Sequence, residues 1–159
     1  MSEENAYGML ILMDGVTSYN YSKEQKEKTA GTGIRLRFQK SEQRPYAGIS
    51  YPIAGKTGTT QNNSDCGLMG MVRILVTGVW VGGEDRSVHF ESTMYGQGAT
   101  MALPVWALYM KDCYNDERLT ISKEEFTVPP NLTIEVDCDK WKEEGKPEDI
   151  EEVPDEFDF

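Results

Sequence analysis

Residues 52–60 read PIAGKTGTT, and this stretch decides how the rest of the sequence is interpreted. It is typical of a strand flanked by Gly and Thr, with Pro52 at its start, where a missing amide proton is tolerated. After a polar turn, two apolar runs with enough β-branched residues to be strands follow at 68–72 and 75–82. Because consecutive strands joined by short turns form an antiparallel meander, the sequence predicts a meander of about three strands.

Two helices are predicted on either side of this meander. Residues 4–18 carry apolar side chains with helical spacing and have Ser2 as a plausible N-cap, and residues 100–114 repeat the pattern. Pro104 fits only near the first turn of the second helix. Residues 19–30 are polar and lysine-rich, which indicates a solvated loop or a frayed helix end, and residues 34–38 are ambiguous between a strand and a helical turn. The predicted class is α+β, with two main helices packed on the sheet.

Composition limits the possible functions. The chain has 159 residues, of which 38% are hydrophobic and 27% charged, and this suits one globular domain or a large piece of one. A net charge of −11 argues against a nucleic-acid partner. No apolar run approaches the roughly 18 to 20 residues needed to cross a bilayer, and the first residues lack the basic start of a signal peptide.

The residues that usually hold metals are scarce. Cys66, Cys113 and Cys138 have no C-x-x-C spacing, and we interpret them as buried or incidental thiols. His89 is the sole histidine and has no partner at helical spacing. The sequence therefore predicts no metal site and no cofactor. We expect Trp80 and Trp106 to be core residues and not ligand contacts.

The Gly55-Lys56-Thr57 triplet has two possible uses. A phosphate-binding loop would need a glycine at position 50, which is Ser50, and a helix after the triplet. Lys-Thr-Gly is also the third active-site motif of the penicillin-recognising serine acyltransferases, after S-x-x-K and S-x-N. There an ammonium and hydroxyls on an edge strand bind a carboxylate, and an amide of the same strand can face an oxyanion.

Blocks along the chain support the second use. In order they are Asn5-Ala6-Tyr7, Gly31-Thr32-Gly33, residues 53–60 followed by Asp65, residues 78–82 (GVWVG), and Gly96-Gln97-Gly98 leading to residues 102–106 (ALPVW). Together these blocks resemble the final part of the transpeptidase domain of a class A (bifunctional) penicillin-binding protein, in a form similar to those of Bacteroides-like bacteria. The resemblance covers residues 1–115 and implies a partial fold of the penicillin-binding protein and serine β-lactamase type. Residues 116–159 are expected to form an acidic, partly disordered extension.

The resemblance also implies roles for four residues. Lys56, Thr57 and Thr59 would hold the carboxylate of a peptidoglycan stem peptide or of a β-lactam. Gly58 would give clearance, and the amide of Thr59 would be one oxyanion donor. The intact parent enzyme would be a D,D-transpeptidase acting on the periplasmic side of the inner membrane, although this chain has no targeting signal.

The nucleophile of that chemistry is missing from the sequence. No serine is followed by a lysine at the third position, so S-x-x-K does not occur. Ser18-Tyr19-Asn20 is an S-x-N, but it lies too near the K-T-G strand to be the family's second motif. We expect the chain to be the last part of a transpeptidase domain, inactive alone, and to self-associate through apolar surface that an upstream half would cover.

Other interpretations stay open at this point. The chain could be a non-catalytic binding module or, less plausibly, a nucleotide-binding protein, and K-T-G alone would also allow a serine β-lactamase relative. The chain departs from the family at Cys66-Gly67-Leu68, where Trp-Phe is usual, and at Arg73-Ile74, which lacks typical turn residues. Both departures are expected to weaken the hairpin that supports the Lys56 strand.

Overall fold

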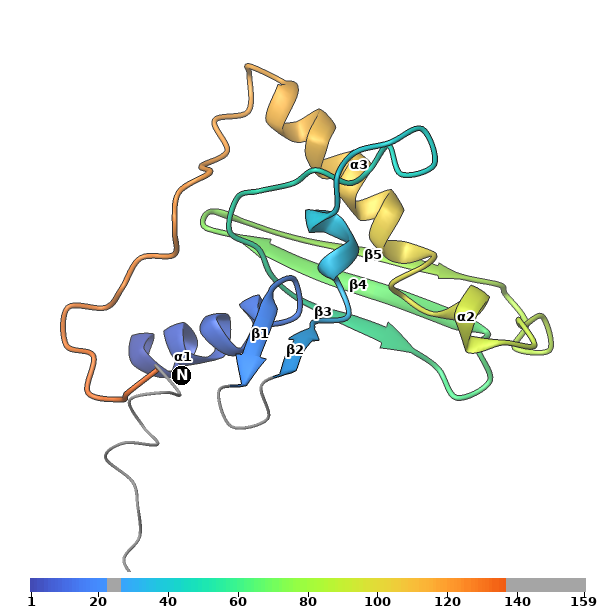
Figure 1. Ribbon diagram of the computed structural model, residues 1–159, viewed down its shortest axis with the longest axis horizontal. Helices are drawn as coiled ribbons and strands as arrows, with labels where there is room; N and C mark the ends of the chain where they lie inside the picture. Colours follow the sequence, from blue (N-terminus) through green and yellow to red (C-terminus); the bar gives the residue numbers. More distant parts are fainter. Residues whose placement is uncertain (23–26, 137–159) are drawn as a thin grey trace, which may run out of the picture.

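The computed structural model describes residues 1–22 and 27–136 of the chain. The elements are α1 (Glu3–Asp14), β1 (Tyr19–Ser22), β2 (Glu27–Ala30), the 3₁₀ helix η1 (Ile34–Arg37), β3 (Ala54–Thr59), β4 (Asp65–Val72), β5 (Leu75–Gly82), α2 (Thr93–Gly96) and α3 (Ala102–Asn115). Strands β3, β4 and β5 form an antiparallel sheet in sequence order, and β1 pairs with β2 in a separate hairpin (Figure 1). The predicted α+β meander is therefore confirmed.

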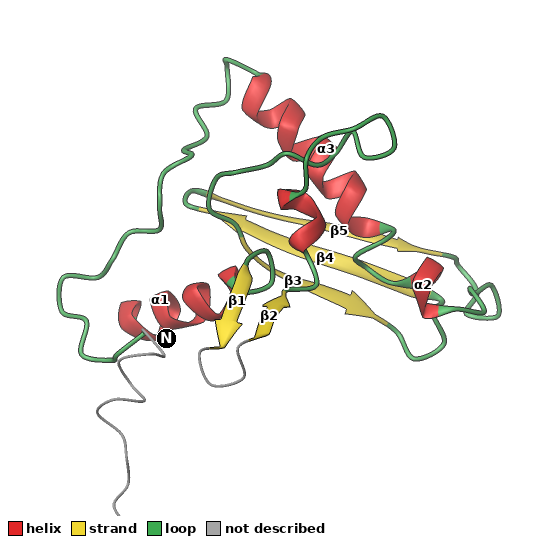
Figure 2. Ribbon diagram, in the orientation of Figure 1, coloured by secondary structure: helices red, strands yellow, loops and turns green. Residues whose placement is uncertain are grey.

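Helix α3 lies over one face of the three-stranded sheet (Figure 2), and much of the hydrophobic core lies between the two. The side chains that meet there are fully or nearly fully buried: Cys66, Leu68 and Val72 of β4 and Leu103, Trp106, Ala107 and Met110 of α3. Gly70 leaves room for the indole, since a Cβ at that position would lie 2.3 Å from Cζ2 of Trp106. The indole N–H donates to Oγ1 of Thr77 at 2.7 Å, so the polar edge of the buried ring is also satisfied.

The opposite face of the sheet is open. Along β5, side chains alternate between half-buried and exposed, and the exposed set shares its face with Met69 of β4. Trp80 belongs to this set and is 65% exposed, so the prediction that it is a core residue is wrong, whereas Trp106 is buried as predicted. An apolar strand read from sequence does not reveal which of its two faces a helix will cover, and this explains the error.

The N-terminal part differs from the prediction in three places. Helix α1 has Ser2 as its N-cap, as predicted, but ends at Asp14 and not at residue 18, because the chain turns at Gly15 and buries Thr17. The Thr17 hydroxyl donates to the carbonyl of Ile53 at 2.9 Å, a contact that a continued helix could not make. The segment predicted as a loop at 19–30 contains β1 and β2, and the ambiguous residues 34–38 form η1.

The Arg37 side chain ties this part to the sheet. Its guanidinium donates to the carbonyls of Thr17, Ile49 and Tyr51 and to Oγ1 of Thr17, at 2.5 to 3.1 Å. Burial lowers the pKa of this guanidinium, and the charge of Asp14 partly opposes that effect. Residues 49–53 lead directly into β3, so Arg37 fixes the direction in which β3 begins.

The segment after α3 returns to the N-terminal helix. The backbone amides of Thr133 and Ile134 and the Thr133 hydroxyl all donate to Oε1 of Glu4, at 2.5 to 2.8 Å. These hydrogen bonds lower the pKa of the Glu4 carboxyl. Residues 137–159, which include Cys138 and the acidic run expected to be disordered, lie outside the described residues. Among the helices that the structure describes, none has the length and apolar character needed to span a bilayer.

Candidate functional site

The K-T-G motif lies on β3, at one edge of the sheet. Its neighbour β4 pairs Lys56 with Met69, Thr57 with Leu68 and Gly58 with Gly67. The amide of Thr60 donates to the carbonyl of Asp65 at 3.0 Å. Because such bonds alternate along an antiparallel pair, the backbone amides of Thr57 and Thr59 point away from β4 toward the open edge.

The interpretation of this motif as a phosphate-binding loop is wrong. Gly55-Lys56-Thr57 lies inside a strand, and a turn and a second strand follow it. A phosphate-binding loop instead wraps its glycine-rich backbone around the anion and leads into a helix.

Thr57 of the motif and Thr59, which follows it, lie on the side of the sheet that faces α3. The hydroxyl of Thr57 lies 2.9 Å from that of Thr32, and the hydroxyl of Thr59 accepts a hydrogen bond from the amide of Gly98 at 3.2 Å. Thr32 belongs to the Gly-Thr-Gly block and Gly98 to the Gly-Gln-Gly block. Both blocks contribute to the family resemblance, but the sequence does not show that both contact β3. The fold thus brings three separated blocks to one strand edge.

Lys56 starts from the opposite face of the strand. Strand alternation places it on the open side of the sheet, beside the exposed Met69. Its ammonium nevertheless reaches the edge, where Nζ donates to the carbonyl of Thr57 at 2.7 Å. The side chain of Lys56 and those of Thr57 and Thr59 leave opposite faces of the strand. The ammonium, the two hydroxyls and the outward amides nevertheless lie along the same open edge of β3.

The two glycines at this site have different surroundings. A Cβ on Gly58 would meet nothing within 4 Å, so the strand is accessible at that residue. A Cβ on Gly98 would lie 2.4 Å from the carbonyl oxygen of Gly67 and 2.7 Å from that of Gly58. Gly98 is therefore required for the close approach of its loop to the strand, while Gly58 is free to face a ligand.

A hollow of about 230 Å³ lies beside the motif. It is lined by the end of β3, the facing part of β4 and one aromatic side chain: Gly58, Thr59, Thr60, Asp65, Cys66, Gly67 and Trp80. Trp80 is the residue that the sequence interpretation missed, because its apolar strand indicated only burial. Its exposed ring gives the hollow an apolar wall next to Gly58 and Thr59.

The nucleophiles nearest to the motif are not activated. Cys66 is paired with Thr59 in the sheet, but its thiol is 5% exposed and burial raises its pKa, which keeps it protonated. The Ser64 hydroxyl contacts Thr60 Oγ1 at 3.2 Å and Asp65 Oδ2 at 3.1 Å. Within the described residues, no serine hydroxyl is hydrogen-bonded to a lysine side chain, which is the contact that activates the serine in S-x-x-K chemistry.

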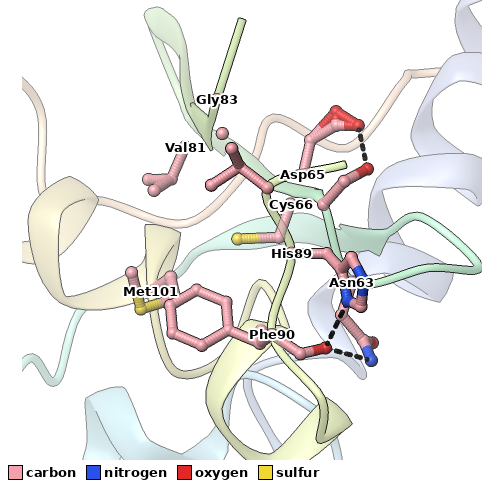
Figure 3. A pocket seen from close by; sticks show the side chains of 12 residues that line it. Asn63, Asp65, Cys66, Val81, Gly83, His89, Phe90 and Met101 are labelled. Atoms are coloured by element: carbon pink, nitrogen blue, oxygen red, sulfur yellow. Dashed lines mark hydrogen bonds between the residues drawn. The ribbon is translucent and has the colours of Figure 1, made fainter. Parts of the chain in front are cut away.

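A second cavity, of about 310 Å³, lies where β4 begins and β5 ends, and it does not include the motif (Figure 3). Val81, Phe90 and Met101 form apolar walls around the Cys66 sulfur, and Asn63 is hydrogen-bonded to the Phe90 backbone at its rim. His89 also lies at this rim, exposed to solvent. In the part of the chain that the structure describes, no three His, Cys, Asp or Glu side chains are gathered so that they could hold a metal ion.

Sequence comparison finds similar proteins for about half of the chain. It is 35% identical over 85 residues to penicillin-binding protein 1A of Aquifex aeolicus, a match that covers 53% of this chain and 11% of that protein. It is 31% identical over 97 residues to penicillin-binding protein 1A of Escherichia coli, covering 54% and 11% respectively. No protein-family model matches the chain. These relatives do not test the narrower resemblance to Bacteroides-like bacteria.

The fold agrees with the sequence comparison. The crystal structure of penicillin-binding protein 1A from Haemophilus influenzae matches 82% of this chain with a TM-score of 0.58 and 26% identity. The match covers 17% of that chain. The chain thus spans about a tenth of the curated relatives' length and about a sixth of the solved one.

Proposed function

Because the chain is related to class A penicillin-binding protein 1A over about half its length and shares the fold of part of that protein, we propose that it carries the substrate-binding strand of a peptidoglycan D,D-transpeptidase. In this proposal residues 1–115 are the last portion of the transpeptidase domain and residues 116–159 are an extension. The substrate is the D-Ala-D-Ala end of a stem peptide, on the periplasmic side of the inner membrane. A β-lactam would occupy the same strand.

The observation that carries the proposal is the meeting of ligand-binding groups along the edge of β3. The Lys56 ammonium lies at the Thr57 carbonyl, and the hydroxyls of Thr57 and Thr59 are held by Thr32 and Gly98. A carboxylate placed at this edge would find a cation and hydroxyl donors together, which is the arrangement that binds such groups. The outward amides allow the rest of a peptide to continue as an added strand.

Gly58 and Thr59 complete the proposed chemistry. The open space at Gly58 admits an acyl chain close to the backbone. The outward amide of Thr59 can donate to an oxyanion that forms next to this strand. A full oxyanion hole needs a second donor, and acylation needs a nucleophile. The S-x-x-K motif that would supply the nucleophile does not occur in the 159 residues. We therefore propose that the chain alone binds its substrate weakly and does not form an acyl-enzyme.

The test is an NMR titration of the ¹⁵N-labelled chain with N-acetyl-D-Ala-D-Ala. We expect saturable shifts of the amides of residues 56–59, with a Kd weaker than ~1 mM because an exposed ion pair supplies little affinity without the rest of a cleft. Lys56→Met should weaken binding at least fivefold, and Gly58→Val should abolish it by filling the open space. Lys40→Met removes an exposed lysine from another segment and serves as the charge-matched control.

Three results would overturn the proposal. The first is the absence of saturable shifts at residues 56–59. The second is an equal loss of affinity in Lys56→Met and Lys40→Met. The third is equal binding of the L-Ala-L-Ala dipeptide, since the proposed site belongs to D-configured stem peptides.

A further inference from the structure

The segment 90–98, which lies between β5 and α3, contacts the K-T-G strand at Thr59. There the amide of Gly98 donates to Oγ1 of Thr59 at 3.2 Å. A threonine hydroxyl has one proton to donate and two lone pairs with which to accept. Because the Gly98 amide occupies a lone pair, the proton of Thr59 is left for another acceptor. A carboxylate at the edge of β3 is an acceptor of the kind that this proton suits.

Asn63 fixes the other end of this segment. The backbone amide of Phe90 donates to the Asn63 carbonyl at 3.3 Å, and Nδ2 of Asn63 donates to the Phe90 carbonyl at 3.3 Å (Figure 3). A Cβ on Gly96 would lie 2.7 Å from Cβ of Asn63, so the segment and the turn before β4 are in close contact there as well. The segment is therefore held against the sheet at both of its ends.

Asn63 has an unusual backbone conformation. Among the described residues other than glycine, it alone has a positive φ, of 50°. This left-handed region is unfavourable for residues with a side chain, and asparagine is among those that tolerate it best. Such a conformation persists where surrounding contacts hold it, and conformations of this kind cluster at ligand sites. The contacts with Phe90 are the ones that hold it here.

The turn that carries Asn63 is fixed relative to Thr59. The amide of Thr60 donates to the Asp65 carbonyl at 3.0 Å, and the amide of Asp65 donates to Oγ1 of Thr60 at 3.1 Å. The amide of Asn63 donates to the Thr60 carbonyl at 3.0 Å. Since Thr60 directly follows Thr59, this hydrogen-bonded turn sets the position of Asn63 relative to the Thr59 hydroxyl.

We propose that Asn63 is a positioning residue for the Thr59 hydroxyl. By holding Phe90, it keeps the segment 90–98 against the sheet with the Gly98 amide on Oγ1 of Thr59, and the Thr59 proton is then directed toward the substrate carboxylate. The first amides of α3 hold the Gly98 carbonyl, and Asn63 holds the segment on the side of α2. This inference rests on the proposed function, because it concerns a hydroxyl assigned there to the carboxylate.

The first test needs no ligand and follows hydrogen exchange of the ¹⁵N-labelled amides of the full chain. In Asn63→Asp, the new carboxylate cannot donate to the Phe90 carbonyl and repels it. We expect the Gly98 amide to exchange at least about tenfold faster there, the fold-change that the loss of one hydrogen bond gives, while amides between β4 and β5 keep their native rates. Thr59→Val removes the acceptor and gives the rate of the Gly98 amide without this bond.

Two further variants separate the side chain from its charge and its backbone. Gln61→Glu makes the same amide-to-carboxylate change at an exposed residue of the same turn and should leave the exchange of Gly98 native. Asn63→Gly permits the left-handed backbone and keeps the carbonyl that the Phe90 amide uses, so it should speed the exchange less than Asn63→Asp does. Circular dichroism of each variant checks that the fold is retained, and Asn63→Gly carries the comparison if Asn63→Asp does not fold.

The second test measures whether Asn63 acts through Thr59. The affinity for N-acetyl-D-Ala-D-Ala is compared in Asn63→Asp, Thr59→Val and the double variant, with Gln61→Glu as the charge-matched control. We expect Asn63→Asp to bind at least about threefold more weakly than the control, as expected for residues that share one hydrogen-bond network. The double variant should bind no more weakly than Thr59→Val alone, because the hydroxyl that Asn63 positions is already absent.

An unchanged exchange rate of the Gly98 amide in the Asn63 variants would overturn the inference, whatever the dipeptide does. So would additive losses of affinity in the double variant, since Asn63 would then act by a route other than Thr59. Absence of dipeptide binding by the native chain would instead overturn the proposed function. The exchange rates would still decide in that case whether Asn63 holds the Gly98 amide on the Thr59 hydroxyl.

Discussion

The contrast between Gly98 and Gly58 gives a direct test of the site's construction. In Gly98→Ala, the new methyl would lie 2.4 Å and 2.7 Å from two main-chain oxygens of the sheet, and neither can move without disturbing the β3–β4 ladder. The loop must therefore withdraw, which breaks the hydrogen bond from its amide to Oγ1 of Thr59. The carbonyl of Gly98 also accepts from the amides of Ala102 and Leu103, so the start of α3 would shift as well.

The magnitude follows from these contacts. Overpacking against rigid neighbours costs about 1–3 kcal/mol, and losing the hydrogen bond adds about 1 kcal/mol. We therefore expect Gly98→Ala to lower the free energy of unfolding by about 2–4 kcal/mol. For a chain of this size, that corresponds to a fall in Tm of about 5–15 °C.

Gly58→Ala is the matched control, because a methyl there meets nothing within 4 Å. Its stability should stay within about 1 kcal/mol of the native chain, with a small gain from the reduced entropy of the unfolded state. Both variants are compared by urea denaturation followed by circular dichroism. Equal stability of the two variants would refute the close approach of the Gly98 loop to β3.

Three further predictions concern the core around the site. Arg37→Met leaves three main-chain carbonyls and a hydroxyl without their donor and should cost about 3 kcal/mol in urea denaturation, and a cost below about 1 kcal/mol would contradict the role assigned to Arg37. Trp106→Phe removes the indole hydrogen bond to Thr77 and part of the buried ring, so we expect a loss of about 2 kcal/mol, and an unchanged denaturation midpoint would argue against this packing. Burial raises the pKa of Tyr114 to about 12, so above pH 10 the unfolded chain loses this proton first and stability should fall as the pH rises from about 10 to 12. Thermal melts of Tyr114→Phe should show a shallower fall over that range, and an identical fall in both proteins would exclude Tyr114 as a cause.

The sheet and α3 could be predicted because the spacing of apolar residues within each segment indicates its secondary structure without knowledge of distant contacts. The predicted strand at 75–82 matches β5, and the one at 68–72 matches the end of β4, which begins earlier, at Asp65. The spacing of Leu103, Trp106 and Met110 matches the buried face of α3. The K-T-G motif was predicted to lie on a strand that begins at Pro52, where a missing amide proton is tolerated, and the resemblance implied that this is an edge strand. Such local rules act within a few residues, and the structure agrees with them there.

What the sequence did not reveal depends on contacts between distant residues. Thr17 is buried because its hydroxyl meets the Ile53 carbonyl, and this contact ends the N-terminal region's helix earlier than the apolar spacing suggests. The meeting of Thr32 with Thr57 and of Gly98 with Thr59 joins segments 25 and 39 residues apart in the chain. The exposure of Trp80 depends on which face α3 covers, which no property of β5 alone determines.

We propose that the chain presents the substrate-binding strand of a transpeptidase without the nucleophile that would react. The most direct measurement is the intact mass of the purified chain after incubation with excess benzylpenicillin, supported by fluorescent penicillin on a denaturing gel. We predict an unmodified mass and no labelled band, because Cys66 and Ser64 are not activated and S-x-x-K does not occur in the sequence. A mass increase of one penicillin per chain, with labelling that unlabelled penicillin prevents, would contradict the claim, and mapping the modified residue would identify the nucleophile.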